Sequence, residues 1–493
     1  MFGFIRRINC DQNATTDLSP KARRAIIKAL KGPQANPSSP YAEGREASYL
    51  IERARKDLAD VVNVEPESLI FTSGATEADN YVRSIAPLLS KSRRAIVYNP
   101  MEHPAMIASL RLLEAEGFSL IALKPDRLGR IDLEELKRRW NDNICLTVMM
   151  AANNETGTLY DIAALAQFTK ASGAYFFSDM VQALGKIKID LKALSVDYAS
   201  FSAHKIGGPK GVGALYARPG APFAPVLLGG NQEGGRRAGT EAVHDIIGFG
   251  AALREVPSIL SRVESLRALK ENFIASVKLI CPEVIINSPS SRFCQPGTVS
   301  LTFPGRDNAF LLGHLEFYGV SAAAGSACKS GDNAPSSALT AAGLSAQEAR
   351  STLRFSFGPR FSRKDLNYLV KVLKKIFSEK SDKEIIVLRP RDVTEDLILG
   401  KDLTIIHIRR FPKFKGLKPL IGSRVINLAD RLSWETLKLN GPTLLTCETG
   451  YDAPIMAFRL KRRGFSQLGV LAGGLWGLRL SRPELWARLL ELT

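Results

Sequence analysis

The sequence predicts an α/β protein with a mainly parallel β-sheet, followed by a second, smaller α/β unit. From about residue 15 to 255, short apolar runs alternate with amphipathic helical stretches, which is typical of parallel sheets covered by helices. The N-terminus and residues from about 256 to 380 add a long helical stretch and further strand-like runs, which predicts a smaller α+β part. Strand-like runs begin again after the polar segment 378–384, so we expect one unit over 1–380 and another over 384–493.

The individual elements follow from helix-start signals and from apolar runs. Ser19 and Pro20 precede an amphipathic stretch that stops at Gly32, the expected order of N-cap, first helical residue and terminator. Strands of the first sheet are expected in SLIFT, RAIVYN, CLTVMMA, AYFFSD and DYASFSA, with helices in EASYLIERARKDLADVV and DIAALAQFTKASG. Further strands are expected in TVSLTF and STLRFSF, and the closing helix of this part in DLNYLVKVLKKIFSEK.

The composition is that of an ordinary globular protein, with 45% hydrophobic and 24% charged residues over a length of 493. No apolar run reaches the ~18 residues of a membrane helix, and the start MFGFIRRINC turns polar too early for a signal peptide. We therefore expect a cytoplasmic protein without a membrane partner. Basic residues outnumber acidic ones by 67 to 49, but the basic stretches 409–418 and 461–463 lack interleaved aromatics, so direct nucleic-acid binding is not expected.

The six cysteines and five histidines indicate neither a disulfide framework nor a metal site. There is no CxxC pair, and the histidines lack metal-ligand spacing. A functional cysteine is therefore expected to act alone, as a reduced thiol.

The segment FSAHKIGGPKG carries a lysine at a strand end. Lys205 follows a predicted strand that ends at Ala203, and it precedes a glycine-rich turn that lets the backbone approach a ligand closely. Such a lysine can form a Schiff base, and the alternative is a solvated surface charge. Asp179 ends another apolar run, where a carboxylate can serve a pyridine ring nitrogen or simply cap the strand end.

The segment FTSGATE at 71–77 follows a predicted strand and opens a helix. Backbone N–H groups and hydroxyls at such a helix start bind anions such as phosphate. A capping box would explain the same residues without a ligand, so the segment is informative only together with others.

Together with Met101–Pro104, Asn153–Gly157 and Gly234–Thr240, these segments resemble the cysteine desulfurases, which are class V aminotransferase-like enzymes of fold type I that use pyridoxal 5′-phosphate (PLP). The resemblance covers about residues 8–375, with the motifs in the family's order. It implies that Lys205 holds PLP through an imine and that Asp179 pairs with the pyridinium nitrogen. The remaining implied cofactor residues are His103 on the ring, Asn154 and Gln182 beside the phenolic oxygen, Ala75, Thr76, Ser202 and His204 around the phosphate, and Thr240 from the second subunit of a homodimer.

The substrate side of the resemblance rests on a small-residue loop with one thiol. Cys328 lies beside Lys329 between glycines, and nearby positive charge lowers the pKa of a thiol. The alternative for a lone cysteine is a small buried hydrophobe. The resemblance implies that Cys328 takes sulfur from L-cysteine as a persulfide and that Arg354, with Asn154, binds the substrate carboxylate. It also implies that Lys205 and His103 carry protons and that alanine is released.

Two positions depart from the family pattern. Gln12 replaces an asparagine in the N-terminal segment 11–16, and Asn231 stands in a glycine tract of the family. Both departures concern the substrate fit and leave the expected cofactor residues unchanged.

The C-terminal unit resembles a rhodanese domain in the order of its strand-like runs and in its single thiol. Cys447 precedes a loop that closes onto a helix start, where backbone N–H groups favour a thiolate, and Asp452 and Pro454 fit that start as cap and early-turn residues. Two departures are Asp452, where many rhodaneses carry a basic residue, and His407, which occupies the usual aspartate position. A degenerate binding module, in which Cys447 only ends a strand, is the alternative.

The sequence therefore supports a cysteine desulfurase that passes its persulfide from Cys328 to Cys447 for delivery to an acceptor, such as an iron–sulfur scaffold or a tRNA-modifying enzyme. One alternative keeps the PLP fold as a class V aminotransferase or selenocysteine lyase, against which the Cys328 loop speaks. Another makes the C-terminal unit a docking module for acceptor proteins or tRNA.

Overall fold

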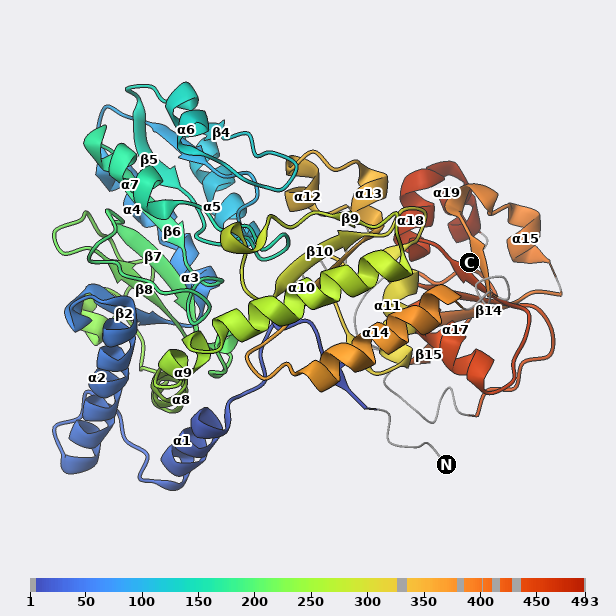
Figure 1. The fold of residues 1–493 in the computed structure, drawn as a ribbon, viewed down its shortest axis with the longest axis horizontal. Coiled ribbons are helices and arrows are strands. Elements are labelled where there is room, and N and C mark those ends of the chain that lie inside the picture. The colour runs from blue at the N-terminus through green and yellow to red at the C-terminus, as the bar shows by residue number, and fades with distance from the viewer. Residues whose placement is uncertain are drawn as a thin grey trace.

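The computed structural model describes residues 6–325, 335–378, 385–400, 402–409, 417–427 and 436–491. A seven-stranded sheet and its helices occupy one end of the molecule, and a five-stranded sheet occupies the other (Figure 1). A three-stranded sheet and the long helix α10 (Val263–Ile280) lie between them (Figure 1).

The seven-stranded sheet is parallel except for one strand. Its spatial order is β2 (Leu69–Thr72), β8 (Gly213–Ala217), β7 (Tyr198–Ser202), β6 (Tyr175–Asp179), β5 (Ile144–Val148), β3 (Ala95–Tyr98) and β4 (Ser119–Ala122). β8 runs antiparallel to both of its neighbours. The expected strands are confirmed, and most are buried along their length, because helices cover both faces of such a sheet.

Helices pack on this sheet, and their starts follow the capping signals in the sequence. The predicted first helix is confirmed as α1 (Pro20–Lys31), because the Ser19 side chain accepts a hydrogen bond from the Ala22 N–H at 3.1 Å. The other helices of this part are α2 (Ala42–Val62), α3 (Ala75–Asn80), α4 (Val82–Leu89), α5 (Pro104–Ala115), α6 (Leu133–Arg139), α7 (Ile162–Ala171) and α8 (Val243–Leu253).

The smaller part is built around an antiparallel sheet of order β12 (Thr352–Ser356), β10 (Thr298–Thr302) and β9 (Ile285–Ile286). The N-terminal strand β1 (Ile8–Asn9) pairs with β11 (Val320–Ser321). The helices around them are α9 (Val256–Leu260), α10, α11 (Asn308–Phe317), α12 (Ser337–Ala341), α13 (Ala346–Arg350) and α14 (Arg363–Ser378). The segment 10–16, which follows β1, therefore runs from the smaller part toward the strand ends of the seven-stranded sheet.

The five-stranded C-terminal sheet is entirely parallel. Its order is β13 (Ile385–Leu388), β17 (Leu468–Leu471), β16 (Thr443–Cys447), β14 (Thr404–Arg409) and β15 (Arg424–Asn427). Its helices are α15 (Glu395–Leu399), α17 (Asp452–Arg462), α18 (Gly474–Ser481) and α19 (Pro483–Glu491). The expected cap at Asp452 is wrong, since Tyr451 is the N-cap of α17 and Asp452 is the first residue inside the helix.

Helix α17 packs directly on α11 of the preceding part (Figure 1). The Phe310 and Phe458 rings meet edge to face at 5.1 Å, and the His314 ring lies 3.7 Å from Phe458. Arg459 and Glu316 form an ion pair at 3.0 Å beside these rings. The C-terminal sheet is therefore attached through an aromatic contact between two helices.

Over the described ranges, every helix is too short or too polar to cross a lipid bilayer. The same ranges contain no cluster of His, Cys, Asp and Glu side chains that could hold a metal ion.

Candidate functional site

The site lies where β6 and β7 end, because the carboxyl ends of neighbouring parallel strands bring their following residues together. Asp179 is the last residue of β6 and is 6% exposed, and its Oδ1 accepts the Val181 N–H at 2.9 Å. Burial raises the pKa of the Asp179 carboxyl to about 6, although the Lys205 charge lowers it. Lys205 follows β7 in the short helical turn Ala203–Lys205. The structure therefore brings these two predicted residues together.

The N-terminal segment lies across Lys205. The Lys205 Nζ donates to the carbonyl oxygens of Asn13 at 2.7 Å and Ala14 at 2.8 Å. The next turn has Gly207 at a φ of +88°, and its N–H donates to the Thr16 hydroxyl at 2.7 Å. Glycine suits this positive φ, so the glycine after Lys205 sets the path of the chain against the N-terminal segment.

His103 is the N-cap of α5, and its Nδ1 accepts the Ala105 N–H at 3.2 Å. Burial and, secondly, the Lys205 charge lower the pKa of the His103 ring to about 4. The ring is therefore neutral near pH 7, with its proton assigned to Nε2, since Nδ1 acts as the acceptor.

The predicted phosphate residues come from two strand ends. Ala75 and Thr76 begin α3, and no side chain caps this helix start. Ser202 ends β7 and is buried, and the His204 Nδ1 lies 3.1 Å from the Thr15 hydroxyl.

The loop that carries Thr240 lies near the start of α3. Arg237 forms an ion pair with Glu77 at 2.9 Å, and this contact holds the 234–240 segment beside the helix. Thr240 itself is exposed on this single chain. Its expected role across a dimer remains a prediction.

Arg354 lies in β12 and is 2% exposed. Its guanidinium donates to the carbonyl oxygen of Asn154 at 2.9 Å and to Asp11 Oδ1 at 2.5 Å. Its Nε is buried and has no hydrogen-bond partner in the described part of the chain. The structure thus brings Arg354, Asn154 and the N-terminal segment together.

The predicted nucleophile Cys328 lies outside the described residues. Both described flanks of its loop adjoin Glu155. Ser336 donates to the Glu155 carboxylate at 2.6 Å, and a side-chain carbon at Gly325 would lie 3.3 Å from the same carboxylate.

Two residues that the sequence analysis missed connect the site. Asn13 accepts Gln182 Nε2 on its carbonyl oxygen at 3.0 Å and donates its Nδ2 to the Thr298 hydroxyl at 2.9 Å. Lys186 donates to Asn13 Oδ1 at 2.9 Å and to the Gln182 side-chain oxygen. Burial, and then the charges of Lys205 and Arg354, lower the pKa of Lys186 well below its usual range. The only sequence signal for Lys186 is its spacing of four residues from Gln182.

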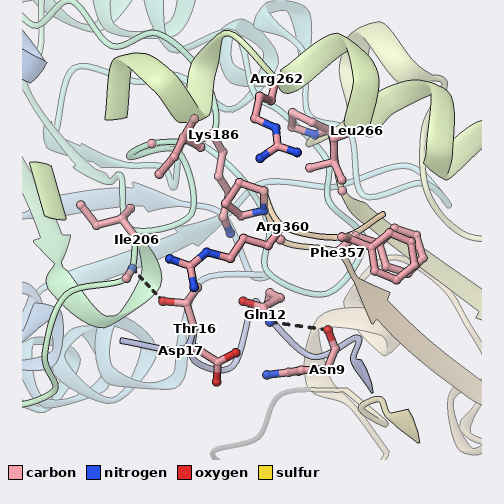
Figure 2. Close-up of a pocket in the computed structure, with 18 of the residues that line it drawn as sticks. Asn9, Gln12, Thr16, Asp17, Lys186, Ile206, Arg262, Leu266, Phe357 and Arg360 are labelled. Carbon is pink, nitrogen blue, oxygen red and sulfur yellow. Dashed lines mark hydrogen bonds between the residues drawn. The ribbon is translucent and has the colours of Figure 1, made fainter. Parts of the chain in front are cut away.

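A cavity of about 330 Å³ adjoins Lys205 on the side of the N-terminal segment. Lys186, Arg262 and Arg360 lie on its wall (Figure 2). His103, Asp179 and Arg354 do not line it. Among the predicted cofactor residues, this cavity is therefore lined by Lys205 alone.

The second predicted thiol, Cys447, ends β16 and is fully buried. Its Sγ accepts backbone N–H groups of Gly450 at 3.1 Å and Ala453 at 3.4 Å. Burial and the Asp452 charge nevertheless raise the pKa of this thiol to about 11. His407 is buried in the neighbouring strand β14, where its Nδ1 lies 3.1 Å from the Thr446 hydroxyl.

Comparison with known proteins identifies most of the chain. Residues 8–369 match the model of the aminotransferase class-V family. The chain is 36% identical over 376 residues to a cysteine desulfurase IscS of Dictyoglomus turgidum, covering 76% of this chain and 95% of that one. It is also 36% identical over 375 residues to a cysteine desulfurase IscS of Escherichia coli, covering 75% and 92% of the two chains.

Solved structures agree with this result. A NifS-like protein superposes with a TM-score of 0.71 at 31% identity, covering 76% of this chain and all of the other. A structure described as SspA in complex with cysteine has a TM-score of 0.62 at 29% identity, covering 71% and 99%. The chain therefore belongs to the class V aminotransferase family and, within it, to the cysteine desulfurases.

Proposed function

We propose that this chain is a PLP-dependent cysteine desulfurase that takes the sulfur of L-cysteine as a persulfide on Cys328 and releases alanine. The observation that carries the proposal is the meeting of Lys205, Asp179 and the N-terminal segment at the ends of β6 and β7. An amine and a buried carboxylate at adjacent strand ends suit the two ends of a pyridine aldehyde. The 36% identity to a cysteine desulfurase IscS over 376 residues supports the same substrate.

The residues present fit PLP. Lys205 would bind its aldehyde, Asp179 its ring nitrogen, and the neutral His103 ring would lie on its face. When bound, PLP supplies an electron sink for the substrate carbanion. The further residues we assign to its binding are Ala75, Thr76, Asn154, Gln182, Ser202, His204 and Thr240.

Arg354 would bind the substrate carboxylate. Its guanidinium is buried, and its Nε has no partner in the described ranges, so a bidentate anion can gain a hydrogen bond there. Asp11 occupies another guanidinium nitrogen and keeps the charge paired in the absence of substrate. Asn154 holds the guanidinium through its carbonyl oxygen.

Lys205 and His103 would hold and move protons at the substrate carbon. His103 is unprotonated near neutral pH because its pKa is lowered to about 4 by burial first and by Lys205 second. A neutral ring can accept a proton, as general-base work requires. Lys205 can then carry the proton that completes alanine.

Cys328 would act as the nucleophile toward sulfur. Its thiolate forms an S–S bond with the substrate sulfur, the carbon–sulfur bond breaks, and the bonding electrons remain with the carbon skeleton that becomes alanine. Lys329 is adjacent in sequence, and a neighbouring cation favours the thiolate.

We further propose that residues 384–493 form a rhodanese-like domain, following a desulfurase domain over 1–380. In the relay, the Cys447 thiolate attacks the outer sulfur of the Cys328 persulfide, and Cys328 leaves as a thiolate. The parallel sheet and the backbone N–H groups at Cys447 support this step. The raised pKa of Cys447, caused by burial and Asp452, favours the second candidate, a docking module for acceptor proteins.

The proposal includes a homodimer in the cytoplasm. Thr240 is exposed at the end of a segment that Arg237 holds beside α3, where it can reach a second subunit. The five cysteines within the described ranges are unpaired and buried, as expected for a reducing compartment. The final acceptor would be an iron–sulfur scaffold or a tRNA-modifying enzyme.

The test is mass spectrometry of the Cys328 and Cys447 peptides after incubation of the PLP-loaded protein with labelled cysteine. We expect label on both thiols in the native chain and on neither in Cys328→Ala, which should retain its PLP absorbance. Cys145→Ala, a change at a buried thiol far in sequence from both, is the matched control. Cysteine turnover by Cys328→Ala would contradict the nucleophile, and normal onward transfer by Cys447→Ser would favour the docking module.

A further inference from the structure

Three buried carboxyl groups lie close together near the carboxyl ends of the central strands of the seven-stranded sheet. Asp79 of α3 is 1% exposed, Glu102 is 5% exposed, and Asp179 is 6% exposed. Only Asp179 has a part in the proposed function. Carboxylates are seldom buried without a cation, so the other two need a physical explanation.

Asp79 lies directly beside the strand pair that carries Asp179. Ser200 of β7 is the register partner of Asp179 in β6. The Ser200 hydroxyl donates to Asp79 Oδ1 at 2.6 Å, which places the Asp79 carboxyl against this strand pair. The two aspartates therefore share one small, dry region around Ser200.

Glu102 approaches the same region from the loop before α5. Its Oε1 accepts the Met150 N–H at 2.5 Å, while its Oε2 is buried and has no hydrogen-bond partner within the described ranges. A buried carboxylate oxygen without a donor is costly, whereas a protonated oxygen loses much less solvation.

The charges that act on the three carboxyls differ. The Lys205 cation acts on Asp179 and opposes the effect of burial there. Burial, followed by repulsion from Asp179, raises the pKa of both Asp79 and Glu102 well above their usual range. One cation near three buried carboxyls favours a single negative charge, because like charges in a low dielectric repel strongly.

We propose that Asp79 is a positioning residue that stays a neutral acid, so that Asp179 alone carries the carboxylate charge toward the ring nitrogen of the cofactor. The neutral Asp79 accepts the Ser200 hydroxyl on one oxygen and keeps its proton on the other. This inference rests on the proposed role of Asp179, and it adds a residue that sets the charge of Asp179 without touching the cofactor.

The proposal predicts how stability depends on pH. An aspartate that is neutral in the folded chain loses its proton on unfolding at any pH above its ordinary pKa of about 3.9. Folding then becomes less favourable as pH rises, until Asp79 ionises in the folded state. The groups that face this region are Glu102, Asp179, His103 and Lys205, and they are the same in the native chain and in an Asp79→Asn variant.

The first test is infrared difference spectroscopy of the full-length apoprotein at neutral pH, comparing the native chain with Asp79→Asn. We expect the native chain to show the carbonyl band of a protonated carboxyl group that the variant lacks. Loss of a carboxylate band instead would overturn the proposal. Asp142→Asn, at an exposed aspartate, is the matched control and should remove a carboxylate band.

The second test is urea unfolding of the same apoproteins between about pH 5 and 7. The unfolding equilibrium constant of the native chain should rise relative to that of Asp79→Asn, up to tenfold per pH unit. A ratio that stays constant with pH would show that Asp79 is ionised or merely structural. If Asp79→Asn does not fold, Ser200→Ala keeps the carboxyl but removes its hydrogen-bond donor, so the protonated-carboxyl band should shift in frequency; an unchanged band would overturn the proposal.

A failure of this proposal about Asp79 can be distinguished from a failure of the proposed function. Both measurements use protein without PLP, so they report on Asp79 whether or not Asp179 binds the ring nitrogen. A normal PLP absorbance in Asp179→Ala would reject the cofactor role of Asp179 while leaving the protonation of Asp79 as measured.

Discussion

At the scale of single residues, the site depends on which groups are charged. The Lys205 charge lowers the pKa of both Asp179 and His103, so it favours an ionised Asp179 and a neutral His103. The sequence allowed Lys205 and Asp179 to be predicted because both follow buried strands, and strand ends in parallel sheets converge. Asn13, Lys186 and Asp79 could not be predicted, because their contacts come from segments that meet only in the folded chain.

The affinity of the apoprotein for PLP should depend on pH through Asp179. Its pKa is raised to about 6 by burial, so below that pH the carboxyl is protonated and cannot pair with a pyridinium. We expect the dissociation constant for PLP to increase as pH falls from about 7.5 to 5, measured by fluorescence titration.

Asp179→Asn is the control for this pH dependence. The variant should bind PLP more weakly at neutral pH and should show little of the increase through pH 6. An equally steep dependence in Asp179→Asn would assign the titration to another group.

Asp452 should control the reactivity of Cys447. The pKa of this thiol is raised to about 11 by burial first and by the Asp452 charge second, against an ordinary value of about 8.5. Replacing Asp452 with Asn removes the charge, so the pKa of Cys447 should fall and its alkylation rate at a given pH should rise. The measurement is the pH profile of iodoacetamide labelling, read on the Cys447 peptide. Asp402→Asn, an exposed aspartate of the same part, should leave the profile unchanged.

At the scale of elements, the sequence was most informative where local signals act alone. The strand runs and α1 were predicted, since apolar runs and the Ser19–Pro20 start depend on neighbours in sequence. The antiparallel direction of β8 was not predicted, because a strand carries the same pattern in either direction. The two-residue strand β9 is too short to leave any periodicity.

The cap of α1 provides a direct test at this scale. Ser19→Ala removes the acceptor of the Ala22 N–H and should lower the free energy of unfolding by about 1 kcal/mol, measured by urea denaturation. Ser19→Thr keeps a hydroxyl acceptor and should retain most of the stability. An equal loss in both variants would show that the side-chain cap does not account for the effect.

At the scale of the whole molecule, the C-terminal part is joined to the rest through α11 and α17. No local pattern in the sequence predicts this contact, because Phe310, His314 and Phe458 become neighbours only when the two helices pack. The contact includes the first turns of α17, the helix whose start donates an N–H to Cys447. The position of the Cys447 loop is therefore tied to α11.

Gly313 is the point at which this arrangement can be tested. A side-chain carbon there would lie 3.2 Å from the Pro454 Cβ and 3.3 Å from Phe458, so Gly313→Leu should force α17 away from α11. We expect faster hydrogen exchange or proteolysis within 452–462, with desulfurase turnover in the presence of an external thiol largely unchanged. If the relay needs the docked arrangement, persulfide on Cys447 should fall while persulfide on Cys328 remains.

Glu316→Gln removes only a partly exposed ion pair with Arg459, so it should behave like the native chain. Unchanged exchange in Gly313→Leu would show that the packing of α11 on α17 does not hold the C-terminal part in place.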